Sequence, residues 1–136
     1  NEVNMDLGRT VGEELLRPTK IYVRPVLKAL ERFSIRGMAH ITGGGLPGNL
    51  PRILPPGLKA VIREGTWPVP PVFALIEKLG PVKREEMYRV FNMGVGFVLV
   101  SAEKEASALA DYFKCQDVDA YLIGKIEKGI KKFELK

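Results

Sequence analysis

Gly37 to Pro56 read GMAHITGGGLPGNLPRILPP, and the rest of the chain is organised around this stretch. It predicts a strand, a triple-glycine turn and then a short helix with Pro47 near its start. Glycine has no Cβ, so the backbone of such a turn can come close to a ligand. Between Glu31 and Glu64 there are only basic charges and no acidic residue. The stretch is therefore suited to an anion, and phosphate is the first candidate.

The composition is that of a soluble globular protein. The 136 residues suit a single domain, which we expect to span residues 1–136. Net charge is +5, which permits anionic partners without requiring nucleic acid. No run approaches the roughly 18 apolar residues of a membrane span, and no signal-peptide pattern opens the chain. We therefore expect a cytoplasmic protein that has neither a membrane nor a nucleic acid as its partner.

Hydrophobic periodicity predicts that helices and strands alternate along the chain. Helices are expected at 21–33, 46–54, 72–79, 83–91 and 103–114. Strands are expected at 38–42, 58–62, 95–100 and 120–126, with 95–100 covered on both faces. We expect a lead-in over the first 17 residues, an N-cap at Thr19 and a frayed tail over 127–136. This order predicts an α/β (α+β) domain with a mixed sheet and helices on its faces, and it leaves the strand order open.

The first candidate residues for anion binding lie at the glycine turn. By alternation, His40 shares a strand face with Thr42, just before the glycines. His40 is the candidate catalytic residue: it could hold a phosphate oxygen as a cation or donate a hydrogen bond while neutral. The alternative is a structural hydrogen-bonding residue. Gly43, Gly44 and Gly45 could direct N–H groups at phosphate oxygens, or they could form only a tight turn that needs positive φ.

Two further pairs follow in the chain. Asn49 and Arg52 lie three residues apart, which predicts one shared helical face, and Arg52 could bind phosphate in a bidentate manner. The alternative is a capping asparagine and a solvated arginine. Asn92 and Gly94 come between a helix and a buried strand, where ligands often bind, although a left-handed helix stop at Asn92 would also explain the asparagine. We predict no metal site, because an enzyme that uses Mg-ATP needs carboxylates and the window around the glycines has none.

Four blocks of the sequence together resemble one family. They are LLRPTKIY at 15–22, AHITGGGL at 39–46, NLPR at 49–52 and EMYRVFNMGVG at 86–96. The blocks resemble phosphoribosylformylglycinamidine cyclo-ligase, also called AIR synthetase, of purine biosynthesis, and AHITGGG followed by N-x-P-R is the most specific of them. The resemblance covers only the C-terminal domain of that family, which implies an α/β domain with a mixed sheet, partly like a ferredoxin fold. One departure is Gly48, which stands where an acidic residue is expected before Asn49.

The resemblance implies an ATP-dependent ligase that forms a C–N bond. The family converts formylglycinamidine ribonucleotide and ATP to aminoimidazole ribonucleotide, ADP and phosphate. The formyl oxygen is activated by phosphoryl transfer, and a nitrogen of the same substrate then closes the imidazole ring. Such chemistry requires phosphate positioning and charge neutralisation, a role that the residues from His40 to Gly45, with Asn49 and Arg52, would suit.

The resemblance also implies a partner. In the full enzyme an N-terminal domain forms a dimeric β-barrel and supplies the acidic residues for ATP and Mg²⁺. We therefore expect this domain to be missing from the chain, which fits the abrupt start at Asn1, and we expect the chain alone to be inactive. The full-length enzyme is expected to be a homodimer. The alternative is a non-catalytic ligand- or partner-binding module of the same fold, or a member of the related selenophosphate synthetase and amidotransferase group.

Overall fold

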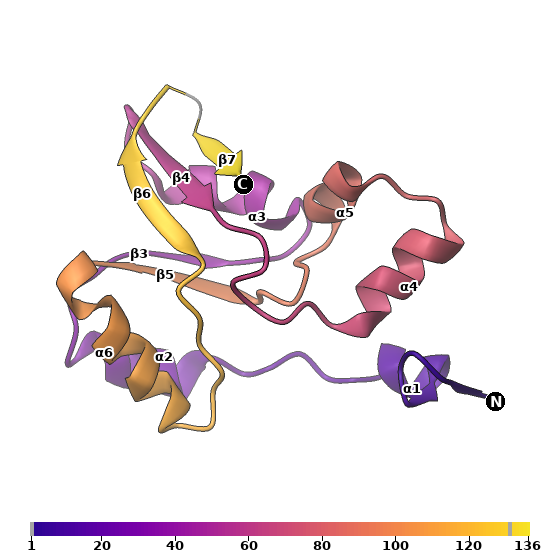
Figure 1. Cartoon of the computed structure of the whole chain (residues 1–136). Helices are drawn as coiled ribbons and strands as arrows, with labels where there is room; N and C mark the ends of the chain where they lie inside the picture. Colours follow the sequence, from indigo (N-terminus) through magenta and orange to yellow (C-terminus); the bar gives the residue numbers. More distant parts are fainter. Residues whose placement is uncertain (1, 131) are drawn as a thin grey trace.

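The computed structural model describes residues 2–130 and 132–136, which excludes Asn1 and Lys131 (Figure 1). The strands are β1 (Val3–Asn4), β2 (Arg9–Thr10), β3 (Ile35–His40), β4 (Leu58–Ile62), β5 (Phe97–Ser101), β6 (Gly124–Lys128) and β7 (Phe133–Leu135). The helices are α1 (Val11–Leu15), α2 (Val23–Leu30), α3 (Gly45–Asn49), the 3₁₀ helix η1 (Leu50–Ile53), α4 (Pro71–Leu79), α5 (Arg84–Val90) and α6 (Glu103–Lys114). The mixed α/β fold is confirmed, and within the described residues no helix combines the length and apolarity needed to cross a membrane.

β3 and β5 form an antiparallel pair in the middle of the molecule (Figure 1). His40 pairs with Phe97 at one end of the ladder. The predicted alternation is confirmed, because Ala39 and Ile41 are buried whereas Met38 and His40 are exposed. The ladder therefore presents one face to a core and carries His40 on the other.

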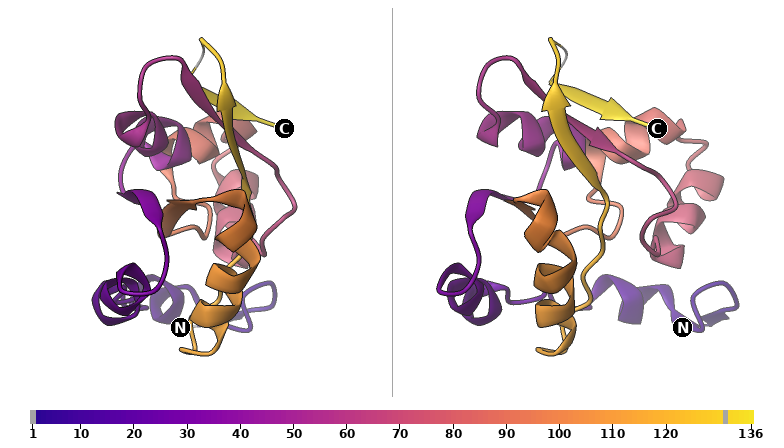
Figure 2. Two further views of the ribbon diagram at one scale, coloured as in Figure 1. Left: turned by 90° about the vertical axis from the view of Figure 1, so that its left-hand side faces the viewer. Right: turned by 60° about the vertical axis from the view of Figure 1, so that its left-hand side comes forward.

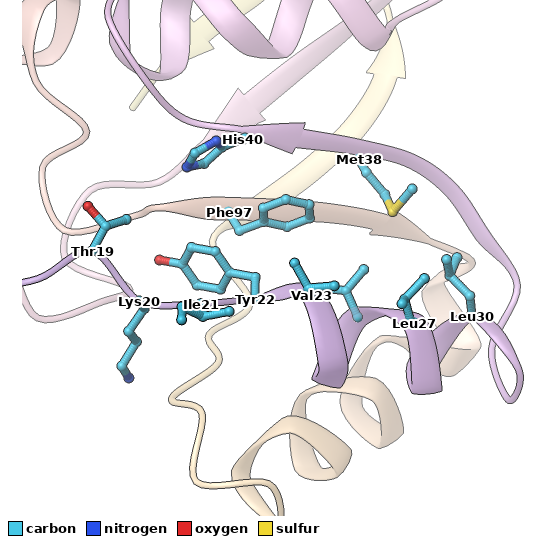
Figure 3. Close-up of a pocket in the computed structure, with 11 residues that line it drawn as sticks. Thr19, Lys20, Ile21, Tyr22, Val23, Leu27, Leu30, Met38, His40 and Phe97 are labelled. Carbon is cyan, nitrogen blue, oxygen red and sulfur yellow. The ribbon is translucent and has the colours of Figure 1, made fainter.

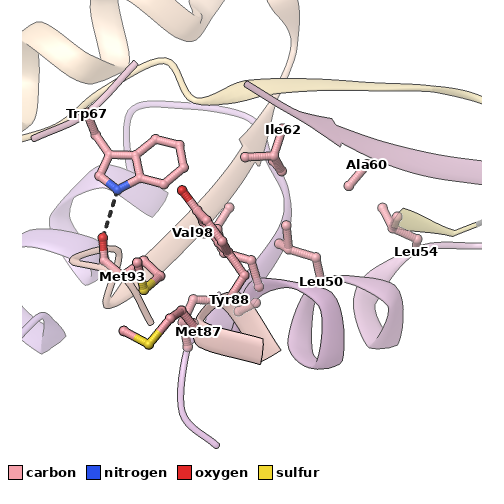
Figure 4. Packing of buried hydrophobic residues seen from close by; sticks show 12 residues of the cluster. Leu50, Leu54, Ala60, Ile62, Trp67, Met87, Tyr88, Met93 and Val98 are labelled. Atoms are coloured by element: carbon pink, nitrogen blue, oxygen red, sulfur yellow. Dashed lines mark hydrogen bonds between the residues drawn. The ribbon is translucent and has the colours of Figure 1, made fainter. Parts of the chain in front are cut away.

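The larger core covers the face of the ladder that carries Ala39 and Val98. It is completed by α3, η1, β4, α5 and the loops next to them (Figure 4). Trp67 closes this core, and its indole Nε1 donates a hydrogen bond to the carbonyl of Met93 at 2.9 Å. A buried indole N–H left without an acceptor would cost free energy, so this bond fixes the loop that carries Met93.

A smaller core lies on the opposite face of the ladder. There α2 and α6 pack together through Val26, Ala29, Leu109 and Phe113. Phe97 and Leu99 of β5 are only partly buried against this cluster. The prediction that β5 is covered on both faces is therefore confirmed in part, since Val98 is its one buried residue.

β4 is the central strand of a separate three-stranded sheet with the order β6-β4-β7. It runs antiparallel to β6 and parallel to β7, so this sheet is mixed. The prediction of a frayed tail is wrong, because Phe133 pairs with Ala60 and the N–H of Lys136 donates to the carbonyl of Ile62 at 2.9 Å. β4 is buried from Ala60 to Ile62, and the apolar residues Phe133 and Leu135 of β7 complete its packing. β6 begins at Gly124 rather than at residue 120.

The N-terminal residues are more ordered than predicted. β1 and β2 pair, and α1 then begins with a capping box in which Thr10 accepts from the N–H of Glu13 and Glu13 accepts from the N–H of Thr10. Thr19 is not an N-cap, because α2 begins at Val23 and residues 17–22 form neither helix nor strand. The sequence Thr-Val-Gly-Glu over residues 10–13 carries the capping-box signature that the prediction overlooked.

An ion-pair cluster joins all three strands of the sheet that contains β4. The Lys59 ammonium of β4 contacts the carboxylates of Glu127 on β6 and Glu134 on β7. The side-chain hydrogen bond from Lys59 lowers the pKa of Glu134, and hydrogen bonds from Lys125 and then Lys59 lower the pKa of Glu127. The bond to Glu134 raises the pKa of Lys59.

We predict that Lys59→Met lowers the free energy of unfolding at neutral pH and that this loss shrinks as the pH falls. Carboxyls with a lowered pKa in the folded state stabilise it above their unfolded pKa, and this stabilisation disappears as they are protonated below about pH 4. The raised pKa of Lys59 keeps its contribution intact throughout this range. Urea unfolding at several pH values, with the exposed Lys128→Met as the control, measures the effect. An equal loss in neutral and acidic buffer would contradict the ion-pair explanation.

Candidate functional site

A polar cavity of about 460 Å³ lies where β3 ends and the triple glycine begins. Three segments build it: residues 17–22, residues 40–42 and the turn that follows α5. Its lining residues are Arg17, Thr19, Lys20, Tyr22, His40, Ile41, Thr42, Asn92, Gly94 and Gly96. Among these described residues there are three basic side chains and no carboxylate. The cavity is therefore suited to an anion rather than to a cation.

A second cavity of about 380 Å³ adjoins the first (Figure 3). The two share Thr19, Lys20, Tyr22 and His40 as lining residues, so they are neighbouring parts of one depression. The other residues of the second cavity are apolar and come from residue 21, α2, β3 and β5: Ile21, Val23, Val26, Leu27, Leu30, Met38 and Phe97. One depression thus combines a polar part beside the glycines with an apolar part beside α2.

The structure explains on steric grounds why glycine is required at two of the three positions of the triple glycine. Gly44 has φ +96° and Gly45 has φ +55°, both in the left-handed region. A Cβ on Gly45 would overlap the carbonyl oxygen of Tyr88 and would lie 2.7 Å from that of Phe91. The N–H of Gly45 donates to the carbonyl of Thr42 at 3.0 Å, so it is used within the loop. Backbone constraint therefore accounts for Gly44 and Gly45, whereas a Cβ on Gly43 would meet nothing within 4 Å.

Asn49 holds the glycine loop together from inside the protein. It is buried, and its Nδ2 donates to the carbonyls of Thr42 and Gly43 at 3.3 Å and to that of Gly45 at 2.8 Å. The sequence predicted one shared helical face for Asn49 and Arg52, but Asn49 is buried whereas Arg52, on η1, is exposed. Arg52 is not among the described residues that line the cavity. Asn49 thus shapes the site, and phosphate contact by Arg52 remains a prediction.

Asn92 and Gly94, which the sequence offered as candidate site residues, both line the polar cavity. Asn92 Oδ1 accepts from the N–H of Gly94 at 2.9 Å. The alternative explanation from the sequence, a left-handed helix stop at Asn92, is wrong, because the non-glycine residue with a left-handed φ in this turn is Met93, at +50°. Gly94 has φ +91°, and a Cβ there would lie 2.5 Å from Cδ of Pro70. The turn after α5 is therefore fixed by its own backbone at the cavity wall.

Three rings lie together in the depression: Tyr22 and His40 line both of its parts, and Phe97 lines the apolar part beside them (Figure 3). The ring centroid of Tyr22 lies 5.4 Å from that of Phe97 and 6.3 Å from that of His40. The hydroxyl of Tyr22 lies where a Cβ of Gly96 would be, so this glycine lets the ring approach the turn. Burial raises the pKa of Tyr22, which keeps its hydroxyl protonated and able to donate at neutral pH.

The sequence prediction missed the contribution of residues 17–22. Arg17 and Lys20 line the polar cavity, although each also contacts a carboxylate: Arg17 lies 3.2 Å from Glu14 and Lys20 lies 3.7 Å from Asp119. Both side chains are more than half exposed, so these pairs are weak and the cations can turn to a ligand. The signal that could have found them was the block LLRPTKIY, which the resemblance included without assigning a role to its cations.

The donor set does not fit Mg²⁺. Within residues 2–130 and 132–136, no three His, Cys, Asp or Glu side chains are grouped so that they could hold a metal ion. Hard divalent cations prefer several carboxylate or carbonyl oxygens. The polar cavity offers ammonium, guanidinium, imidazole and hydroxyl groups instead, which are partners for phosphate.

Comparison with known proteins identifies a family that covers nearly the whole chain. The family described as "AIR synthase related protein, C-terminal domain" matches residues 1–135. This chain belongs to that family. The match confirms the resemblance that the four sequence blocks indicated, and with it the fold class.

Curated relatives carry the name phosphoribosylformylglycinamidine cyclo-ligase. The one from Bacillus velezensis is 51% identical over 122 residues, covering 90% of this chain and 35% of its own length. The one from Caldicellulosiruptor bescii is 48% identical over 91% of this chain and 36% of its own. The Bacillus subtilis relative is 50% identical over 89% of this chain and 35% of its own. The chain thus spans about a third of the length of these relatives.

We predict that Gly45→Ala lowers the free energy of unfolding by at least about 2 kcal/mol. A Cβ there would collide with a backbone carbonyl of α5 and would also strain a left-handed φ. Gly48→Ala is the matched control, because it lies in the same helix with nothing within 4 Å of its Cβ, and it should change stability by less than about 1 kcal/mol. Urea unfolding measures both variants. Equal, small effects would show that α3 does not rest on α5 as described.

Proposed function

We propose that this chain is the C-terminal part of a phosphoribosylformylglycinamidine cyclo-ligase and that its polar cavity binds a phosphate group of the reactants. The observation that carries the proposal is the cavity beside the glycine loop, with Arg17, Lys20 and His40 on its walls and no carboxylate among its described lining residues. The names of the relatives support the reaction. Both formylglycinamidine ribonucleotide and ATP carry phosphate, and the same donors would suit either.

In this proposal the chain binds and orients, and it neutralises charge. Lys20 and Arg17 would attract the phosphate, because they are flexible, exposed cations at the rim of the cavity. Thr42 and the protonated hydroxyl of Tyr22 would donate to its oxygens. His40, next to the ring of Phe97, would donate or hold a proton at the edge nearest the apolar part. Positioning of this kind lowers the barrier of a ring closure by fixing the reacting atoms.

The carboxylates that hold Mg-ATP would come from an N-terminal domain, as would the contacts of a homodimer. ATP supplies the phosphoryl group that activates the formyl oxygen, and the residues described here would hold phosphate rather than metal. A non-catalytic ligand-binding module of the same fold is the alternative. It predicts phosphate binding as well, so only activity separates the two.

We predict that Lys20→Ala weakens the binding of inorganic phosphate about tenfold, as expected for the loss of one charge-assisted contact. Lys104→Ala removes the same charge from the exposed start of α6, far along the ladder from the cavity, and should change affinity little. Isothermal titration of the whole chain at low salt measures both, with Arg52→Ala as a test of the earlier sequence prediction. Ribose 5-phosphate and ATP, added as competitors, would distinguish the two sources of phosphate. Equal weakening by Lys20→Ala and Lys104→Ala would indicate general charge attraction and contradict the site.

We predict that the 136-residue chain alone produces no aminoimidazole ribonucleotide from formylglycinamidine ribonucleotide and Mg-ATP. Activity should appear when it is mixed with the part of the Bacillus velezensis relative that lies outside the matched region, because that part would bring the missing carboxylates. ADP release and product formation are the readouts. Turnover by the chain alone would contradict the division of roles, and a mixture that stays inactive despite forming a complex would favour the non-catalytic module.

A further inference from the structure

Exposed apolar side chains are concentrated in the N-terminal part of the chain. Fifteen large hydrophobic residues are exposed in the described structure, and ten of them lie between Val3 and Met38. Nine of these ten lie between Val3 and Leu30. This stretch, from β1 to the end of α2, follows one side of the molecule (Figures 1 and 2). Scattered exposed hydrophobic residues are normal, whereas a contiguous group marks a surface that another molecule covers.

Helix α2 shows this most clearly because it carries two apolar stripes. Val26 and Ala29 are buried against α6. Val23, Leu27 and Leu30 follow the spacing i, i+4 and i+7 and are 61%, 56% and 41% exposed. A surface helix needs one apolar stripe to pack on its own core. The second stripe has no such partner among the described residues, although it has the same helical spacing.

The second stripe forms one wall of the apolar cavity, and Met38 of β3 forms another (Figure 3). This cavity shares four lining residues with the polar cavity. Whatever covers the stripe therefore stands directly beside the candidate phosphate site. The proposed reaction needs carboxylates to hold Mg-ATP at this same place. The described residues contain no group of three His, Cys, Asp or Glu side chains that could hold a metal ion.

We propose that the N-terminal apolar face, made of Ile21, Val23, Leu27, Leu30 and Met38, is the surface on which the rest of the cyclo-ligase chain packs. The inference rests on the proposed function, and it identifies the surface through which this chain would contact the rest of the enzyme. The occupant is the part that the curated relatives carry beyond the matched third of their length.

Charge favours this occupant over a second copy of the chain. The exposed cations Lys20, Arg24 and Lys28 lie between and beside the apolar residues of the face. A two-fold contact between copies would place these cations near their own counterparts, which is unfavourable, whereas an acidic surface would complement them. Under the proposed function the rest of the chain brings carboxylates to the adjacent cavity, so this complementarity favours it as the occupant.

The test uses the whole 136-residue chain and the unmatched part of the Bacillus velezensis relative, mixed and analysed by sedimentation velocity and isothermal titration. Leu27→Glu should weaken their association at least tenfold by placing a charge in the apolar contact. This variant should still fold, because Leu27 is 56% exposed and the new carboxylate lies three residues from Arg24. Leu79→Glu is the matched control, since Leu79 is 73% exposed on α4 outside the face, and it should leave association unchanged.

A complex that forms and survives Leu27→Glu overturns the assignment of this face. So does self-association of the chain alone that Leu27→Glu abolishes, because a second copy would then be the occupant. The absence of any complex with the wild-type chain also overturns it. Phosphate titration of the same variants separates this inference from the proposed function. Loss of association with intact phosphate binding supports the face independently of the site, and phosphate binding that is absent throughout counts against the proposed function alone.

Discussion

The approach of Gly45 to the carbonyls of Tyr88 and Phe91 determines the site. It places the start of α3 directly on the end of α5, at a distance that no residue with a Cβ can reach. The glycine loop and the turn after α5 are thereby held side by side. Thr42, just before the glycines, and Asn92 and Gly94 of the turn line the polar cavity, whereas Gly43, Gly44 and Gly45 are not among its described lining residues. Asn49 adds three hydrogen bonds inside the loop, so the loop keeps its shape without help from a ligand. A preformed site of this kind loses little conformational entropy when an anion binds.

The β3–β5 ladder explains why the site lies at its end. The face of the ladder that carries Ala39 and Val98 is covered by the larger core, and on the other face Met38 lines only the apolar cavity, so the polar groups gather at the end marked by His40. Beyond His40 and Phe97 one more hydrogen bond, from the N–H of Ile41 to the carbonyl of Gly96 at 2.9 Å, joins the two strands, and the ring of Tyr22 lies beside this end of the ladder. Gly96 admits the Tyr22 ring at this point. Polar groups from three separate segments can therefore meet beside a rigid scaffold, which is where proteins commonly place binding residues.

Much of this could be predicted from the sequence, for physical reasons that differ between elements. β4 and α6 were predicted at their exact residues: β4 is a short, mostly apolar run that follows the breakers at residues 55–57, and α6 has an apolar stripe with a period of 3.6. The burial of Ala39 opposite His40 followed from strand alternation alone. The roles of Arg17, Lys20 and Tyr22 did not follow, because an irregular segment has no period and its partners lie far along the chain. The same limit hid β7, which has only three residues and is held by pairing with β4. It also hid the buried position of Asn49, whose side chain is held by carbonyls of the glycine loop.

The order of strands in the β6-β4-β7 sheet has a consequence for folding. β4 is complete at Ile62, but both of its hydrogen-bonded neighbours begin only at Gly124 or later. During synthesis the central strand therefore exists for a long period with two open edges, while the chain that will cover them has not yet emerged. Closing so long a loop is slow, and unpaired edges are the part of a nascent chain most prone to wrong pairing. The arrival of the last strands is therefore needed to cover β4, whereas every described residue that lines the polar cavity precedes them in the chain.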